Sequence, residues 1–192
     1  MRRIVSVVCP SFALWAQPPP GNVQEPQPWV LTVEQRNLVL VHDANPAART
    51  AGAMLGQPLT DARALVPGLR SMNADTACLE RAWHQLAHWL TRYTPMVALD
   101  PANAPMDMGG TAGFLLDVSG CAHLFGGEPG LLQDMVDRLQ SRGLPIRAAI
   151  ADTPLAAWGL ARYGNDPLLC VPKGETLPAL RPLPVTALNR PA

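Results

Sequence analysis

The alternation of apolar and polar segments along the chain predicts short strands and helices in turn. A β-branched apolar run over residues 4–8 is typical of a strand buried on both faces, and a short helix is predicted to follow over residues 10–17. Two further apolar runs, at residues 29–33 and 38–41, predict a hairpin whose turn is formed by residues 34–37. The first part of the chain therefore combines a buried strand with a separate hairpin.

Helices are predicted where apolar residues recur at helical spacing or where capping residues begin a segment. Residues 76–93 have the clearest amphipathic pattern, with apolar side chains at the i, i+3, i+4 and i+7 positions. Asn45 and Thr153 are each followed by proline, the usual arrangement of an N-cap and a first helical residue. The predicted helices cover residues 46–51, 58–66, 76–93, 131–139 and 154–162, and further strands are predicted at residues 96–99 and 168–171.

The stretch 113–127 lies at the centre of a strand–helix–strand pattern. It begins as an apolar run that ends in the residues 117–120, Asp-Val-Ser-Gly, which indicates a buried strand closed by a turn. The helical pattern of residues 131–139 follows and is predicted to stop at Gly143. Residues 146–151 are a second strand candidate, so the pattern implies helices packed on a sheet.

The composition indicates a folded protein without a strong charge bias. Its 192 residues suffice for one or two domains, and 48% hydrophobic with 16% charged residues excludes a disordered chain. Because 15 basic residues balance 15 acidic ones, any DNA contact of this chain is expected to be weak. No cysteine pair has C-x-x-C spacing, which argues against zinc and favours a reducing compartment. The cysteines are Cys9, Cys78, Cys121 and Cys170.

The N-terminus permits two interpretations. Arg2 and Arg3 followed by an apolar segment resemble a secretory signal peptide, and a secreted protein would be cleaved after Ala16. Pro10 interrupts that segment, however, and the β-branched residues before it favour a buried first strand. No run reaches the roughly 18 apolar residues that a membrane span requires. A cytoplasmic protein is therefore expected.

Two motifs suggest possible binding functions. His84 and His88 are four residues apart on one helix face, as in metal sites, but zinc proteases have Glu where this chain has Gln85. A solvated or capping pair of histidines is the competing interpretation. Residues 109–113 resemble a phosphate-binding loop, although such a loop follows a strand and opens a helix. Because this segment precedes a strand, a hairpin turn is the preferred interpretation.

Two sets of motifs stand in one order along the chain. One set comprises residues 45–52, 56–67, 93–97 and 116–120, and the other comprises residues 9–13, 120–127 and 149–153. The first set resembles the palm and fingers of Y-family translesion DNA polymerases. The second set resembles one branch of them, the polymerase-like ImuB proteins of the bacterial inducible-mutagenesis cassette. The matching order and spacing extend over nearly the whole chain.

The resemblance implies a fold and a division into domains. The expected fold class is α+β, a ferredoxin-like Y-family polymerase palm with a small fingers insertion, and with the thumb and little finger absent from this chain. On this basis residues 1–17 and 75–178 form the palm. Residues 18–74 form the fingers-like insertion, and residues 179–192 are the start of a truncated thumb.

The same resemblance places the family's catalytic positions on residues that carry no carboxylate. The family's first Asp falls at Val7, and its Asp-Glu pair falls at Ala112 and Gly113. Nucleotidyl transfer in such a palm needs carboxylates at two strand ends to hold two Mg²⁺ ions about 4 Å apart. The chain is therefore expected to have no catalytic residue, no metal and no cofactor, and to be a non-enzyme.

Of the family's triphosphate contacts, only one keeps its residue type. The contacting Tyr falls at Pro46 and the contacting Lys falls at Pro154, whereas an arginine is retained at Arg49. The resemblance therefore makes Arg49 the single expected nucleotide-binding or phosphate-binding residue.

Three aspartates could in principle replace the missing metal ligands. Asp117 lies four residues past Gly113 on the same strand face, about 13 Å away at ~3.3 Å per residue, which is too far. Asp100 and Asp107 lie in or beside the irregular loop 101–110, and the sequence does not exclude them. An active Y-family polymerase with displaced metal-binding carboxylates is therefore the alternative hypothesis.

The resemblance implies a non-catalytic scaffold in SOS-induced translesion synthesis and DNA repair. ImuB-like proteins link the sliding clamp, a recombinase-like accessory protein and an error-prone C-family polymerase during mutagenesis. Most of those contacts are expected to come from C-terminal regions that this chain does not contain. A weak DNA contact is possible, and no membrane partner is expected.

Overall fold

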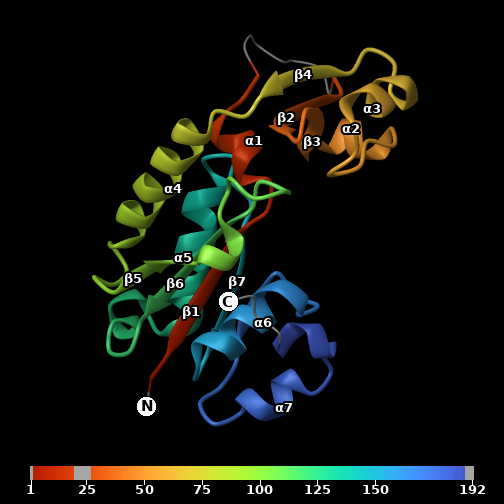
Figure 1. Cartoon of the computed structure of the whole chain (residues 1–192). Coiled ribbons are helices and arrows are strands. Elements are labelled where there is room, and N and C mark those ends of the chain that lie inside the picture. Colours follow the sequence, from red (N-terminus) through yellow and green to blue (C-terminus); the bar gives the residue numbers. More distant parts are fainter. Residues whose placement is uncertain (1, 20–26, 189–192) are drawn as a thin grey trace. The chain divides into compact units, whose positions relative to one another are not determined.

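The computed structural model describes residues 2–19 and 27–188 and consists of two compact units (Figure 1). The first unit comprises Met1–Pro10, His84–Ala104 and Gly113–Ala192, and the second comprises Ser11–Trp83 and Pro105–Ala112. Residues 20–26, near the start of the expected fingers-like insertion, lie outside the described residues. The division into palm, fingers insertion and thumb stays a prediction.

A five-stranded sheet forms the centre of the first unit. Strand β1 lies in the middle and is buried along its whole length, because its β-branched residues face packed layers on both sides. It pairs antiparallel with β7, and β8 adds to β7 in parallel, while β5 and β6 pair antiparallel at the other edge. The order is β5-β6-β1-β7-β8, with bounds β1 Ile4–Cys9, β5 Val97–Leu99, β6 Ala112–Asp117, β7 Arg147–Ala151 and β8 Leu168–Cys170.

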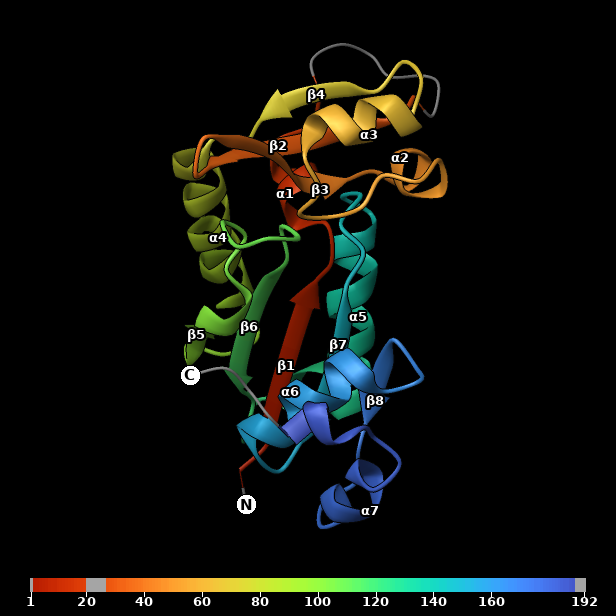
Figure 2. The same ribbon diagram turned by 45° about the vertical axis from the view of Figure 1, so that its right-hand side comes forward.

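Helices cover both faces of this sheet, with α6 (Pro154–Tyr163) on one face and α5 (Glu128–Gln140) on the other (Figure 2). Helix α6 begins at the predicted cap, since the Thr153 hydroxyl accepts the Ala156 N–H at 3.3 Å. Its small apolar residues pack with Ile4 and with residues of β7. Helix α5 buries the face predicted from its spacing, which comprises Leu131, Leu132, Met135, Val136 and Leu139.

The second unit has its own three-stranded sheet. The predicted hairpin is confirmed, and its turn residues Arg36 and Asn37 both have positive φ, 50° and 63°, as a type I′ turn requires. Asn45 caps the next helix through its side chain, which accepts the Ala48 N–H. The strand order is β3-β2-β4, and the elements are α1 Phe12–Ala16, β2 Trp29–Gln35, β3 Leu38–Ala44, α2 Pro46–Thr50, α3 Leu59–Leu65 and β4 Arg70–Asn73.

The remaining elements differ modestly from the sequence prediction. Helix α4 (Thr76–Leu90) ends earlier than predicted and contributes residues to both units. Strand β4, helix α7 (Thr176–Leu180) and a 3-10 turn at Ala122–Phe125 had no predicted counterpart. A search of the described residues finds no helix with the length and apolar character needed to span a bilayer.

Candidate functional site

The three positions where the resemblance expects the family's carboxylates lie on two neighbouring strands. Val7 is fully buried on β1, and Ala112 and Gly113 are the first residues of β6. The Val118 N–H donates to the Arg3 carbonyl, so β6 runs antiparallel to β1 and begins beside the end of β1 (Figure 2). The strand arrangement that a polymerase palm would use is present.

The side chains at these positions cannot hold a metal ion. An isopropyl group, a methyl group and a hydrogen atom stand at Val7, Ala112 and Gly113, and none of them has an oxygen ligand for Mg²⁺. Within residues 2–19 and 27–188, no group of three or more His, Cys, Asp or Glu could hold a metal. The donor set that two-metal nucleotidyl transfer needs therefore does not fit these residues.

Asp100 lies next to this position, but internal donors occupy its carboxylate. The side chain is fully buried, and its Oδ2 accepts hydrogen bonds from Trp158 Nε1 at 2.8 Å and from Asn103 Nδ2 at 2.9 Å. Arg162 Nη2 donates to the same oxygen at 2.8 Å and forms an ion pair with it. Arg162 also donates to Ser6 Oγ on β1 at 3.2 Å. The charge of Asp100 is thus neutralised by a guanidinium of α6.

The space for a side chain at position 113 is filled by the same cluster. A Cβ added to Gly113 would lie 2.9 Å from Asp100 Oδ2, and also 2.9 Å from the Cβ atoms of Asp100 and Asn103. Real Cβ contacts essentially never come so close. A glutamate at position 113 would therefore have to displace Asp100 together with its ion pair.

The other two acids considered as replacement ligands have separate roles. Asp117, at the end of β6, accepts a hydrogen bond from Arg2 Nε at 3.2 Å and from the Ser119 N–H at 3.0 Å. The Ser119 hydrogen bonds and Arg2 hold the pKa of this carboxyl below its usual range. Asp107 is exposed in the loop of the second unit, where its carbonyl accepts the Gly110 N–H.

Arg49, the expected phosphate contact, lies in the second unit at the end of α2. Its Nη2 forms an ion pair with Asp43 Oδ1 at 2.7 Å, and its Nε donates to the Ala44 carbonyl at 2.8 Å. Its side chain is 45% exposed, whereas Asp43 is fully buried. Pro46 and Pro154 are the first residues of α2 and α6 and bring no polar side-chain group. The role of Arg49 in phosphate binding stays a prediction.

The histidine pair and the glycine-rich segment 109–113, the two possible binding motifs, lie in different parts of the structure. His84 and His88 line a surface depression together with Trp89, over whose ring the Arg92 guanidinium stacks at 4.0 Å. Residues 109–111 end the loop between the antiparallel strands β5 and β6, with positive φ at Gly109 and Gly110, and Ala112 and Gly113 already belong to β6. The segment leads into a strand, so it does not match a loop that opens a helix, and a tight hairpin turn over residues 109–113 is not what the structure has.

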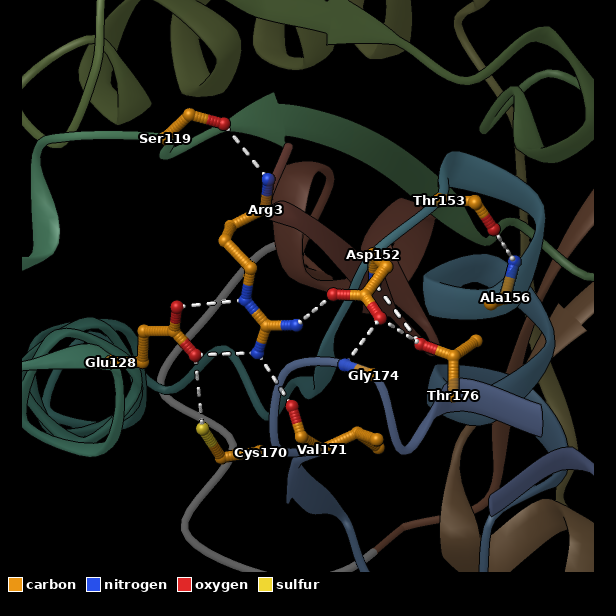
Figure 3. Close-up of polar contacts among 10 residues, drawn as sticks. All are labelled: Arg3, Ser119, Glu128, Asp152, Thr153, Ala156, Cys170, Val171, Gly174 and Thr176. Carbon is orange, nitrogen blue, oxygen red and sulfur yellow. Dashed lines mark hydrogen bonds and ion pairs between the residues drawn. The ribbon is translucent and has the colours of Figure 1, made fainter. Parts of the chain in front are cut away.

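A buried arginine forms a charged cluster in the first unit that sequence reasoning missed (Figure 3). Arg3 donates to both carboxylate oxygens of Glu128, at 2.7 and 2.5 Å, and to Asp152 Oδ1 at 2.7 Å. Its backbone N–H donates to Ser119 Oγ, and its Nη2 also reaches the Val171 carbonyl. The cluster thereby joins β1, the first turn of α5 and the chain segments that follow β6, β7 and β8.

Two residues of the Arg3 cluster belong to the motifs that resemble the family. Ser119 belongs to the motif 116–120, and Asp152 belongs to the motif 149–153. Asp152 additionally accepts the Gly174 N–H at 2.9 Å and the Thr176 hydroxyl at 2.8 Å. At these two motif positions the side chains therefore connect separate segments of the first unit.

Comparisons with known proteins agree on the family and the fold. The model of the impB/mucB/samB family matches residues 24–162. Protein ImuB of Caulobacter vibrioides, from strains NA1000 / CB15N and ATCC 19089 / CIP 103742 / CB 15, is 45% identical over 138 residues, which are 72% of this chain. The chain spans only 28% of the length of these relatives.

Solved polymerase structures share the fold. A post-insertion binary complex of Dbh DNA polymerase has a TM-score of 0.73 at 18% identity, covering 96% of this chain and 52% of that one. DinB from Sulfolobus solfataricus has a TM-score of 0.64 at 18% identity, covering 92% of this chain and 50% of that one. The α+β palm and fingers portion of a Y-family polymerase, expected from the motifs, is confirmed.

Proposed function

This chain belongs to the impB/mucB/samB family, and from that premise we propose that it is a polymerase-like scaffold without nucleotidyl-transfer activity. Its similarity to Protein ImuB makes it a Y-family polymerase-related protein linked to DNA-damage mutagenesis.

The observation that carries the proposal is that Asp100 and Asn103 occupy the space that a side chain at position 113 would need. Two-metal phosphoryl transfer depends on metal ions that neutralise the charge developing on the phosphates. Val7 and Gly113 supply no ligand, and the adjacent carboxylate of Asp100 is already paired with Arg162 at 2.8 Å. Val7, Gly113 and Asp100 therefore offer no open coordination site for Mg²⁺.

We propose that the chain serves SOS-induced translesion synthesis by bringing partners together. The partners we infer are the sliding clamp, an error-prone C-family polymerase and a recombinase-like accessory protein. Because the chain matches only 28% of the length of Protein ImuB, we place most of these contacts in the regions that the match does not include. The zero formal net charge supports weak DNA contact at most.

Primer extension tests the proposal against its alternative, an active polymerase with displaced carboxylates. The chain is incubated with primer–template DNA, dNTPs and either Mg²⁺ or Mn²⁺, beside a Y-family polymerase with intact carboxylates as a positive control. We expect no extension by the chain. Extension by the wild-type chain would establish the alternative and refute the scaffold proposal.

A further inference from the structure

We propose that Asp43 closes the triphosphate position at Arg49, so that a second feature, separate from the missing carboxylates, keeps nucleotides from binding. The inference rests on the proposed function, because it concerns the phosphate contact of the same polymerase-like chain. The ligand class that is excluded is a polyphosphate, free or carried by a nucleoside. All residues in the argument belong to the second unit.

The Arg49 guanidinium already has an anionic partner. Its Nη2 lies 2.7 Å from Asp43 Oδ1, and its Nε donates to the Ala44 carbonyl at 2.8 Å. The same Nη2 lies 3.5 Å from Ser11 Oγ. A phosphate would have to compete with the Asp43 carboxylate for this guanidinium. Because the carboxylate belongs to the same chain, it competes at a high effective concentration.

Electrostatics work in the same direction. Asp43 and Arg49 together carry no net charge, so the pair offers a polyphosphate little attraction. A phosphate that approached Arg49 would also meet the Asp43 carboxylate at close range, where like charges repel. Arg49 is exposed enough to meet a ligand, at 45% of its side chain, but its charge is already compensated.

Asp43 has little freedom to move away from Arg49. It is fully buried on β3, and its Oδ2 lies only 2.8 Å from the place where a Cβ on Gly110 would stand. Gly110 in turn is held by the Ala13 N–H, which donates to its carbonyl at 2.8 Å. The left-handed φ of Gly110, 56°, and its missing side chain are what allow the carboxylate to fit here.

Besides the contact with Arg49, the Asp43 carboxylate accepts one backbone hydrogen bond, from the Ala44 N–H to Oδ1 at 2.8 Å. Among the described residues, Asp43 Oδ2 is buried without a hydrogen-bond partner, which costs stability. Burial raises the pKa of this carboxyl, and the Arg49 hydrogen bond is the largest opposing influence. Arg49 is thus the charged partner of this buried carboxylate.

The test measures binding of inorganic tripolyphosphate and of dATP to the whole chain by calorimetry at pH 7.5. We expect the wild type and Arg49→Gln to bind equally weakly, since Arg49 is not available. Asp43→Asn, which keeps the shape and removes the charge, is expected to bind at least tenfold more tightly. Adding Arg49→Gln to Asp43→Asn should abolish the gain. Asp61→Asn removes an exposed acid of α3 and serves as the matched control.

Several outcomes would overturn the inference. One is Arg49-dependent tripolyphosphate binding by the wild type, a comparison that needs no Asp43 variant to fold. Another is unchanged affinity in a folded Asp43→Asn or in the smaller Asp43→Ser. A gain that persists without Arg49, or that Asp61→Asn reproduces, would do the same. Primer extension by the wild type would instead refute the proposed function, so the two failures are distinguishable.

Discussion

At the residue scale, an internal ion pair lies beside Gly113, one of the positions where the family resemblance expects a carboxylate. Asp100 and Arg162 form this pair at 2.8 Å, and both side chains are nearly or fully buried. A buried pair of this kind contributes little net stability compared with apolar packing, but removing one partner leaves an uncompensated charge. A substitution that removes the charge of Asp100 is therefore expected to lower the stability of the fold.

Removal of the Asp100 charge should destabilise the chain strongly. We expect Asp100→Asn to lower the free energy of unfolding by about 3–5 kcal/mol, because Arg162 is left buried without its counter-charge. The double variant with Arg162→Met should recover much of the loss. Urea denaturation measures both. Arg138→Gln, which breaks the exposed ion pair with Asp134 on α5, is the control and should cost no more than about 1 kcal/mol.

At the element scale, the Arg3 cluster fastens the sheet of the first unit to its surrounding segments. Hydrogen bonding by Arg3 lowers the pKa of Glu128 below its usual range. Burial alone would raise the pKa of Asp152, but the Gly174 N–H, the Thr176 hydroxyl and Arg3 together lower it. A carboxyl whose pKa is lower in the folded state stabilises the fold above its unfolded pKa and loses that effect as the pH falls.

Acid should therefore weaken the first unit through the Arg3 cluster. We expect the wild-type free energy of unfolding to fall as the pH drops below the unfolded carboxyl pKa of about 4, through the lowered folded values of Glu128 and Asp152. Arg3→Gln should be less stable at pH 7 and lose less further stability in acid. Urea denaturation between pH 7 and pH 2 measures this, with Arg81→Gln on the exposed side of α4 as control. Parallel curves for Arg3→Gln and the wild type would count against this account.

At the scale of the whole molecule, the sequence predicts local elements well and long-range pairs poorly. The β-branched run of β1 and the caps Asn45 and Thr153 are local signals, and the structure places an element at each. Strand β4 has no such signal, since the four residues Arg-Ser-Met-Asn become a strand only by pairing with β2, far earlier in the chain. Tertiary pairing decided that element, and local propensity did not.

The candidate site divides in the same way. The motif order gave the positions Val7, Ala112 and Gly113, and the strands bring them to one region of the sheet. The partner of Asp100 was not predictable, because Arg162 is 62 residues away and no spacing rule connects them. Arg49 was identified by its type alone, and its ion pair with Asp43 became visible only in the folded unit.

The most direct test of the central claim is a Mn²⁺ titration of the folded chain, followed by electron paramagnetic resonance, with and without primer–template DNA and dNTP. Mn²⁺ occupies the same oxygen sites as Mg²⁺ and reports binding by its own signal. We predict no saturable site, because Val7, Ala112 and Gly113 offer no ligand and Asp100 is paired with Arg162. Tight, saturable binding of two ions by the wild-type chain would contradict the account.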